Sequence, residues 1–192
     1  MEKGGLAAAL GAAGLSRDDA VLYADELRLG LHGQVRRVLA PKGVKVVQRR
    51  QIEYRWSYLL LAVDPLAGAL RWQWLERFRQ GPLRDALAEW GAAAVVWDGA
   101  GPHRGKDLRE LPTARIGLPP YAPELNPAER VFEEIRRRVE GDTYATLAAK
   151  QAEAEGYLRE LAADPERVTS LCGWGWVVAA LAALPAPTAT PP

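Results

Sequence analysis

The sequence contains one cysteine, Cys172, and two histidines among its 192 residues. A single cysteine excludes an internal disulfide framework and suits a reducing compartment. With so few thiols and imidazoles, and with no CxxC pair, the sequence also argues against a zinc site. Cys172 lies among apolar residues, so we expect a buried small side chain there rather than a nucleophile.

Long hydrophobic runs and a strong net charge are also missing. No apolar run reaches membrane-spanning length, and the N-terminus lacks a basic segment followed by a hydrophobic one. We therefore expect a cytoplasmic protein with no membrane partner. The net charge is +1, so the molecule as a whole is not a polycation. Hydrophobic residues make up 48% and charged residues 26%, which is typical of a globular chain with one core.

The basic residues are unevenly distributed, however. Residues 28–55 include eight basic residues and only one acidic residue, Glu53. The eight are Arg28, Arg36, Arg37, Lys42, Lys45, Arg49, Arg50 and Arg55. A local patch of this kind can hold phosphates even when the total charge is near zero. The alternative is an ordinary solvated surface, and charge alone does not decide between the two.

The order of the elements predicts one α/β domain. We expect a leader at residues 1–20 with at most a short helix, a domain over 21–184, and a disordered tail at 185–192. Strands are expected at 21–27, 54–63, 70–74, 92–97 and 114–118, with a further strand and a basic loop between 28 and 53. Helices are expected at 82–90, 106–110, 127–139 and 144–162, and a last one from Asp164 that Gly173 and Gly175 bend. Such an order favours a mixed sheet with helices on both faces.

Three acids lie at ends of these elements. Asp25 and Asp98 each close a short apolar run, in VLYADEL and AAAVVWDGAG. Glu129 lies at the start of a helix, just after Asn126 in LPPYAPELNPAERVFEEIRRRV. If the strands that carry Asp25 and Asp98 pair, the two carboxylates become neighbours. Acids at strand ends, joined by an acid at a helix start, are what a magnesium site needs.

Each of these acids has competing interpretations. Asn126 followed by Glu129 also fits a capping box, a common local device at a helix start. Glu26 and Glu124 adjoin the proposed ligands and are alternatives in the assignment. Glu26 should nevertheless point to the opposite sheet face from Asp25, because side chains alternate along a strand.

Four segments, YADELRLGL, RRVLAPKG, VVWDGAGPH and LPPYAPELNPAE, together resemble the catalytic (DDE) domain of mariner-related bacterial insertion-sequence transposases. The likeness covers residues 21–184. It implies a ribonuclease H-like α/β fold with a mixed five-stranded sheet, and DNA cleavage with strand transfer at transposon ends. The implied catalytic and metal-binding acids are Asp25, Asp98 and Glu129. They would hold two Mg²⁺ or Mn²⁺ ions, with Asp25 as the ligand of both, and such an ion pair clamps the attacking and leaving oxygens at phosphorus.

The resemblance also implies further contacts. His103 matches a histidine that commonly follows the second acid, and we expect it next to the metal ligands or on DNA. Arg37 and Lys42, from the basic segment, are candidates for the same roles. The second and third acids are 31 residues apart (129 − 98), a little closer than is usual in the family. Gly99 stands where an asparagine is usual, which affects a contact next to the ligands.

Several partners follow from the resemblance. They are the DNA of the transposon ends and target, a second copy in a homodimer, and an N-terminal helix-turn-helix region, separate or fused. Only 24 residues precede Asp25, too few for such a region. One alternative is an inactive or domesticated remnant that acts as a DNA-binding or regulatory protein. Another is a related nuclease of the same fold that acts on other nucleic acids.

Overall fold

A single mixed sheet forms the centre of the computed structural model, which describes residues 5–33 and 39–187. The five strands follow the order β3-β2-β1-β4-β5. They are β1 Val21–Gly30, β2 Trp56–Asp64, β3 Ala69–Leu75, β4 Ala94–Trp97 and β5 Ala114–Gly117. β2 is antiparallel to both β1 and β3, whereas β4 is parallel to both β1 and β5. The mixed five-stranded sheet expected from the sequence is confirmed.

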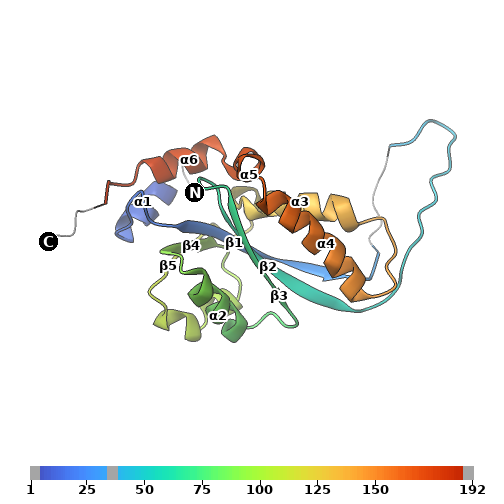
Figure 1. Ribbon diagram of the computed structural model, residues 1–192, viewed down its shortest axis with the longest axis horizontal. Helices are drawn as coiled ribbons and strands as arrows, with labels where there is room; N and C mark the ends of the chain where they lie inside the picture. Colours follow the sequence, from blue (N-terminus) through green and yellow to red (C-terminus); the bar gives the residue numbers. More distant parts are fainter. Residues whose placement is uncertain (1–4, 34–38, 188–192) are drawn as a thin grey trace.

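Helices cover both faces of this sheet (Figure 1). The α-helices are α1 Gly5–Ala12, α2 Gln80–Trp90, α3 Ala128–Val139, α4 Leu147–Ala162, α5 Pro165–Cys172 and α6 Gly175–Ala182. Three short 3-10 helices are η1 Pro102–Arg104, η2 Asp107–Glu110 and η3 Pro123–Leu125. The core on one face includes side chains of α3, α4, α5 and α6, and the core on the other includes those of α2. None of the described helices is long and apolar enough to cross a membrane.

The alternation of side chains along β1 explains the two cores. Tyr23 and Leu27 belong to the core beneath α3, and Leu22 and Ala24 belong to the core beneath α2. Asp25 lies between Ala24 and Glu26 and therefore shares the α3 face with Tyr23. The same alternation directs the Glu26 side chain to the opposite face.

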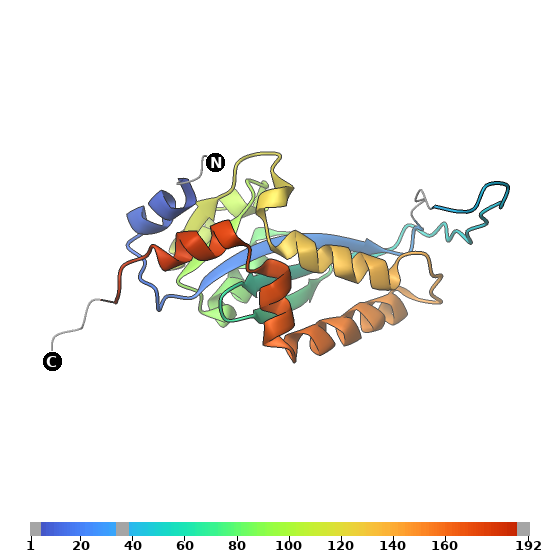
Figure 2. The same ribbon diagram turned by 90° about the horizontal axis from the view of Figure 1, so that it is seen from above.

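The segment between β1 and β2 differs from the prediction. Its described parts, 31–33 and 39–55, contain no strand, so the further strand expected there is wrong for those residues. β1 instead extends to Gly30, which pairs with Trp56 at the start of β2. The N–H of Gly33 donates to the carbonyl of Gln51 at 2.9 Å and closes the base of the loop. Residues 39–50 are all exposed and project from the body of the domain (Figures 1 and 2) because no neighbouring strand is left to pair with them.

The two ends of the described chain lie together. The last predicted helix is divided into α5 and α6 at Gly173 and Trp174, so the glycines end the helix rather than bend it. α1 lies beside α6 in both views (Figures 1 and 2), and its Leu6 and Leu10 are buried in the same core. The expected leader thus contains a helix that packs on the domain. Residues 188–192 of the expected disordered tail lie outside the described residues.

Candidate active site

The pairing of β1 with β4 brings two of the predicted acids to the same place. In this parallel ladder Tyr23 lies opposite Val96. Asp25 is two residues beyond Tyr23, and Asp98 is two residues beyond Val96, so the same register continued puts the two acids side by side. Asp98 is the first residue after β4, where the chain leaves the sheet.

Glu129 reaches the same region from the first turn of α3. A pocket of about 440 Å³ is lined by Asp25, Asp98 and Glu129 together. Its other walls are formed by residues 99–100 of the loop after β4 and by the Pro-rich segment 118–123. Glu124, an alternative in the assignment, is exposed in η3 and does not line the pocket.

Asn126 fastens α3 to β1 below this pocket. Its side chain is 2% exposed, and its Nδ2 donates to the carbonyl of Ala24 at 2.9 Å and to Oδ2 of Asp25 at 3.3 Å. Its Oδ1 accepts from the N–H of Ala128 at 3.2 Å, which satisfies a free donor at the helix start. From the sequence Asn126 was expected only as a cap. It also fixes the distance between the acid on β1 and the helix that carries Glu129.

The capping box that competed for Glu129 is absent from these contacts. The N–H of Asn126 donates to the carbonyl of Pro123 at 2.9 Å rather than to a Glu129 oxygen. Oε2 of Glu129 instead lies 3.3 Å from Nη1 of Arg136, two turns further along α3. Glu129 is therefore positioned by the helix and by one arginine, with its carboxylate in the pocket.

The pKa of Asp25 is strongly affected by its place in the site. Burial raises the pKa of its carboxyl group to about 7, and the charges of Glu26, Glu129 and Asp98 act in the same direction. The N–H of Glu26, which donates to Oδ1 of Asp25 at 2.8 Å, opposes this shift only in part. An acid held in this way favours the approach of a proton or of another cation.

His103 is buried behind Asp98. Its Nδ1 lies 2.8 Å from Oδ1 of Asp98 and 3.1 Å from the Asp98 carbonyl, and its Nε2 lies 2.9 Å from Oε1 of Glu26. The ring stacks on Trp97 with 4.1 Å between centroids. Burial disfavours the imidazolium, but the hydrogen bond and charge of Glu26, with those of Asp98, outweigh it and raise the pKa of His103. Glu26 is thus directed away from the acid pocket, and His103, with a side chain 1% exposed, holds Asp98 in orientation.

The oxygens of the pocket suit a divalent cation, although they do not form a closed cage. In residues 5–33 and 39–187, no group of three or more His, Cys, Asp or Glu side chains is set closely enough to hold an ion. Within the same residues, Oδ2 of Asp98 and Oε1 of Glu129 have no hydrogen-bond partner. Hard divalent cations prefer such carboxylate oxygens.

Two residues of the pocket were missed from the sequence. Tyr121 is fully exposed at the rim and has a φ of 57°, a left-handed conformation that is rare for an aromatic residue. Arg104, from η1, also lines the pocket. No sequence pattern pointed to Arg104, whose placement depends on Gly99, because a Cβ at residue 99 would lie 2.7 Å from Nη2 of Arg104. No pattern in the Pro-rich segment pointed to Tyr121 either.

The remaining candidates lie away from the pocket. Arg37 is outside the described residues. Lys42 is exposed, in the segment that projects from the domain, and is not part of the pocket. Cys172 is buried as expected, and burial raises the pKa of its thiol to about 12.

Known proteins share this architecture. Residues 20–148 match the family described as DDE superfamily endonuclease. Among solved structures, the Mos1 strand transfer complex has a TM-score of 0.64 at 12% identity, with 89% of this chain and 56% of that chain covered. The Mos1 paired-end complex with the left transposon end gives 0.64 at 13% identity, with 96% and 60% covered. The mariner Mos1 paired end complex with Mg gives 0.61 at 13% identity, with 97% and 62% covered. No curated protein matches the chain.

The structural matches and the family match support different conclusions. The structural matches are at 12–13% identity and therefore show the fold, which is the ribonuclease H-like fold expected from the sequence. The chain spans 56–62% of the length of these three Mos1 chains. The family match, in contrast, extends over 20–148, which includes the strands, the pocket and α3. On that match the chain belongs to the DDE superfamily of endonucleases, and its fold is that of the mariner transposase Mos1.

Proposed function

We propose that this domain cuts DNA and joins DNA strands at transposon ends, with Asp25, Asp98 and Glu129 as its catalytic acids. The observation that carries the proposal is that these acids, spread over 104 residues of sequence (129 − 25), line one pocket. Membership of an endonuclease superfamily supports the hydrolytic half of the activity. The strand-transfer half is supported by the fold it shares with Mos1, whose structures include a strand transfer complex.

A divalent metal is the cofactor that this set of residues fits. Paired-end complexes of Mos1 are known with Mn and with Mg. We assign two such ions to this chain, with Asp25 as a ligand of both and Asp98 and Glu129 as ligands of one each. Bound ions of this kind supply Lewis-acid activation of the phosphodiester and of the attacking hydroxyl. The chain's own contribution is orientation. His103 occupies Oδ1 of Asp98 and leaves Oδ2 available, and Asn126 restrains Asp25.

The proposed partners are DNA at the transposon ends, target DNA and a second copy of the chain. A helix-turn-helix region, separate or fused, would recognise the ends. We place the activity in the cytoplasm. Of the two candidates from the basic segment, Arg37 and Lys42, the structure describes Lys42. We assign Lys42, on the projecting loop, to DNA contact.

The substitution Glu129→Gln tests the catalytic assignment. Mn²⁺-dependent nicking of supercoiled plasmid should fall by at least about 100-fold, because an amide is a poor ligand for a hard cation. The melting temperature should stay within about 3 °C of the wild type, since the ion pair with Arg136 is partly exposed and worth about 0–1 kcal/mol. Glu124→Gln, an equal change on an exposed residue outside the pocket, should nick like the wild type. Undiminished nicking by Glu129→Gln would remove that residue from the mechanism.

The open spacing of the carboxylates favours one alternative, a remnant that binds DNA and regulates but does not cut. Isothermal titration calorimetry with Mn²⁺ separates the two functions. The enzyme should bind Mn²⁺ and lose most of that binding in Glu129→Gln, whereas a remnant need not bind the ion at all. Offering RNA–DNA hybrids beside duplex DNA in the nicking assay distinguishes a nuclease of the same fold that acts on other nucleic acid.

A further inference from the structure

Arg104 stands at the junction of two hollows. It lines the acid pocket together with Asp98, and it also lines a second hollow of about 420 Å³. Gly99 allows this placement, because a Cβ at that position would lie 2.7 Å from Nη2 and 3.7 Å from Cζ of Arg104. The guanidinium therefore occupies the space that a side chain at residue 99 would fill, directly beside one of the proposed metal ligands.

The second hollow is lined by three arginines, Arg104 of η1, Arg109 of η2 and Arg115 of β5, which we call the arginine groove. Its remaining walls are His103, Thr113 and Ala114. All three arginines are exposed. In residues 5–33 and 39–187 none of them has an ion-pair partner. Three guanidinium groups without an ion-pair partner among the described residues thus share one concave surface.

The acidic residues of η2 are not part of the arginine groove. Asp107 lines a different hollow, together with Phe78 and Gln80. The lining residues of the arginine groove include no carboxylate.

We propose that the arginine groove holds the phosphate backbone of the DNA strand that leaves the acid pocket. Guanidinium groups bind phosphate oxygens through paired N–H donors, and a free arginine on a concave surface is suited to this contact. Arg104 would bind the phosphate nearest the acids, and Arg109 and Arg115 would bind phosphates further along the same strand. This inference rests on the proposed function, because it takes DNA as the substrate of the acid pocket.

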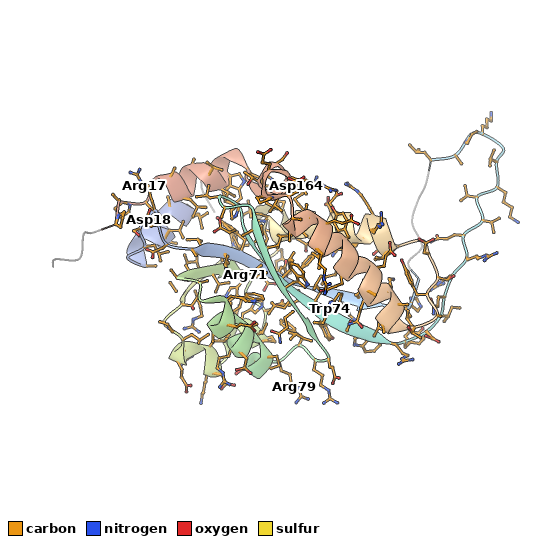
Figure 3. All side chains as sticks on the ribbon, viewed as in Figure 1. Arg17, Asp18, Arg71, Trp74, Arg79 and Asp164 are labelled. Atoms are coloured by element: carbon orange, nitrogen blue, oxygen red, sulfur yellow. The ribbon has the colours of Figure 1, made fainter. Side chains whose placement is uncertain are left out.

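The double substitution Arg109→Ala with Arg115→Ala tests the groove without touching the acid pocket. Binding of a fluorescein-labelled duplex is followed by fluorescence anisotropy in EDTA over a series of KCl concentrations. The plot of log affinity against log salt should become shallower by about 0.9 for each phosphate that the protein no longer neutralises. The matched control is Arg71→Ala with Arg77→Ala, which removes the same charge. Arg71 and Arg77 are exposed, and Arg71 lies on β3, at the opposite edge of the sheet from β5 (Figure 3).

A second pair of substitutions guards against an effect on folding. Arg109→Lys with Arg115→Lys keeps both charges and should restore the wild-type salt slope, because the slope counts neutralised phosphates. A wild-type slope in the double alanine variant, or an equal change in the control variant, would overturn the groove. Failure of the groove is distinguishable from failure of the catalytic proposal. In the first case Glu129→Gln still abolishes nicking, and in the second it does not.

Discussion

At the scale of single residues, the carboxyl group of Asp25 is held in an environment that disfavours its charge. Asp25 is partly buried between Ala24 and Glu26 and has Asp98 and Glu129 nearby, so the folded protein favours its protonated form. Its pKa of about 7 lies above the ordinary value of 3.8. The contribution of Asp25 to stability is therefore fully present below pH 3.8 and is lost as the pH rises through about 7. Such a cost is expected where function requires a cluster of like charges.

Asp25→Asn should accordingly stabilise the protein in EDTA at pH 8 by roughly 2 to 4 kcal/mol, because each pKa unit corresponds to about 1.4 kcal/mol. The amide oxygen keeps the acceptor for the N–H of Glu26, whereas the 3.3 Å hydrogen bond from Nδ2 of Asn126 is lost, which lowers the expected gain. Urea unfolding at pH 8, 6 and 5 measures the effect, and the gain should shrink toward pH 5. Asp18→Asn, at an exposed position (Figure 3), should track the wild type at every pH. A gain for Asp25→Asn that does not change with pH would contradict burial of a charge as its cause.

The same scale shows why part of the site was readable from the sequence. Asp98 follows a strongly patterned strand and Glu129 opens a patterned helix, and Asp25 closes an apolar run, so all three were predicted, and the structure places them at one pocket. β1 nevertheless continues past Asp25 to Gly30, so this acid lies within its strand rather than at the end of it. Arg104 was not predicted because its place depends on a missing side chain at Gly99 rather than on a pattern. The bond between Glu26 and His103 joins residues 77 apart (103 − 26), and no local rule connects them.

At the scale of elements, the turn between β2 and β3 connects the sheet to the C-terminal helices. Oδ1 of Asp64 accepts from the N–H groups of Leu66 and Ala67, both at 3.0 Å, and so stabilises the turn. Gly68 follows with a φ of 64°. A Cβ there would lie 2.2 Å from the carbonyl oxygen of Pro165 at the start of α5. That close approach of backbone to backbone needs a glycine for reasons of space as well as conformation.

Gly68→Ala should destabilise the fold by about 3 kcal/mol or more, because α5 has to move away from the turn. The control is Gly91→Ala at the end of α2, where φ is 61° and nothing lies within 4 Å of a Cβ. Only the left-handed backbone opposes that second change, at a cost of roughly 1–2 kcal/mol. Urea unfolding followed by circular dichroism compares the two. An equal decrease in the free energy of unfolding for both variants would show that the turn and α5 are not in tight steric contact.

The elements that were predicted wrongly depend on contacts that the local sequence pattern does not contain. The valines between residues 44 and 47 alternate loosely, but β1 and β2 already pair from Tyr23 and Val63 through to Gly30 and Trp56. A strand needs a neighbour, so these residues remain in an exposed loop. Likewise, the apolar pattern over 165–182 is continuous, but it does not record that Gly173 and Trp174 interrupt the helix. Pattern predicts which face is apolar, whereas pairing partners come from the whole fold.

At the scale of the whole molecule, the buried cores and the exposed basic residues of the segment before β2 lie in different parts. The two cores lie on either side of the sheet and hold the acids in register. The projecting loop, in contrast, carries exposed lysines and arginines over residues 42–50 (Figure 2). A loop with no buried residue adds little to folding, and its positive charge has to be explained by solvation or by an anionic partner.

Lys42→Gln with Lys45→Gln distinguishes these two explanations. The melting temperature should stay within about 2 °C of the wild type, because both side chains are exposed on the projecting loop and contact no core. If the loop contacts DNA, the salt dependence of duplex binding in EDTA should become shallower by about 0.9 for each lysine that neutralises a phosphate. The doubly substituted Arg71 and Arg77 variant again controls for the loss of two positive charges. An unchanged salt slope would assign the loop to a solvated surface and leave DNA binding to the face that carries the acids.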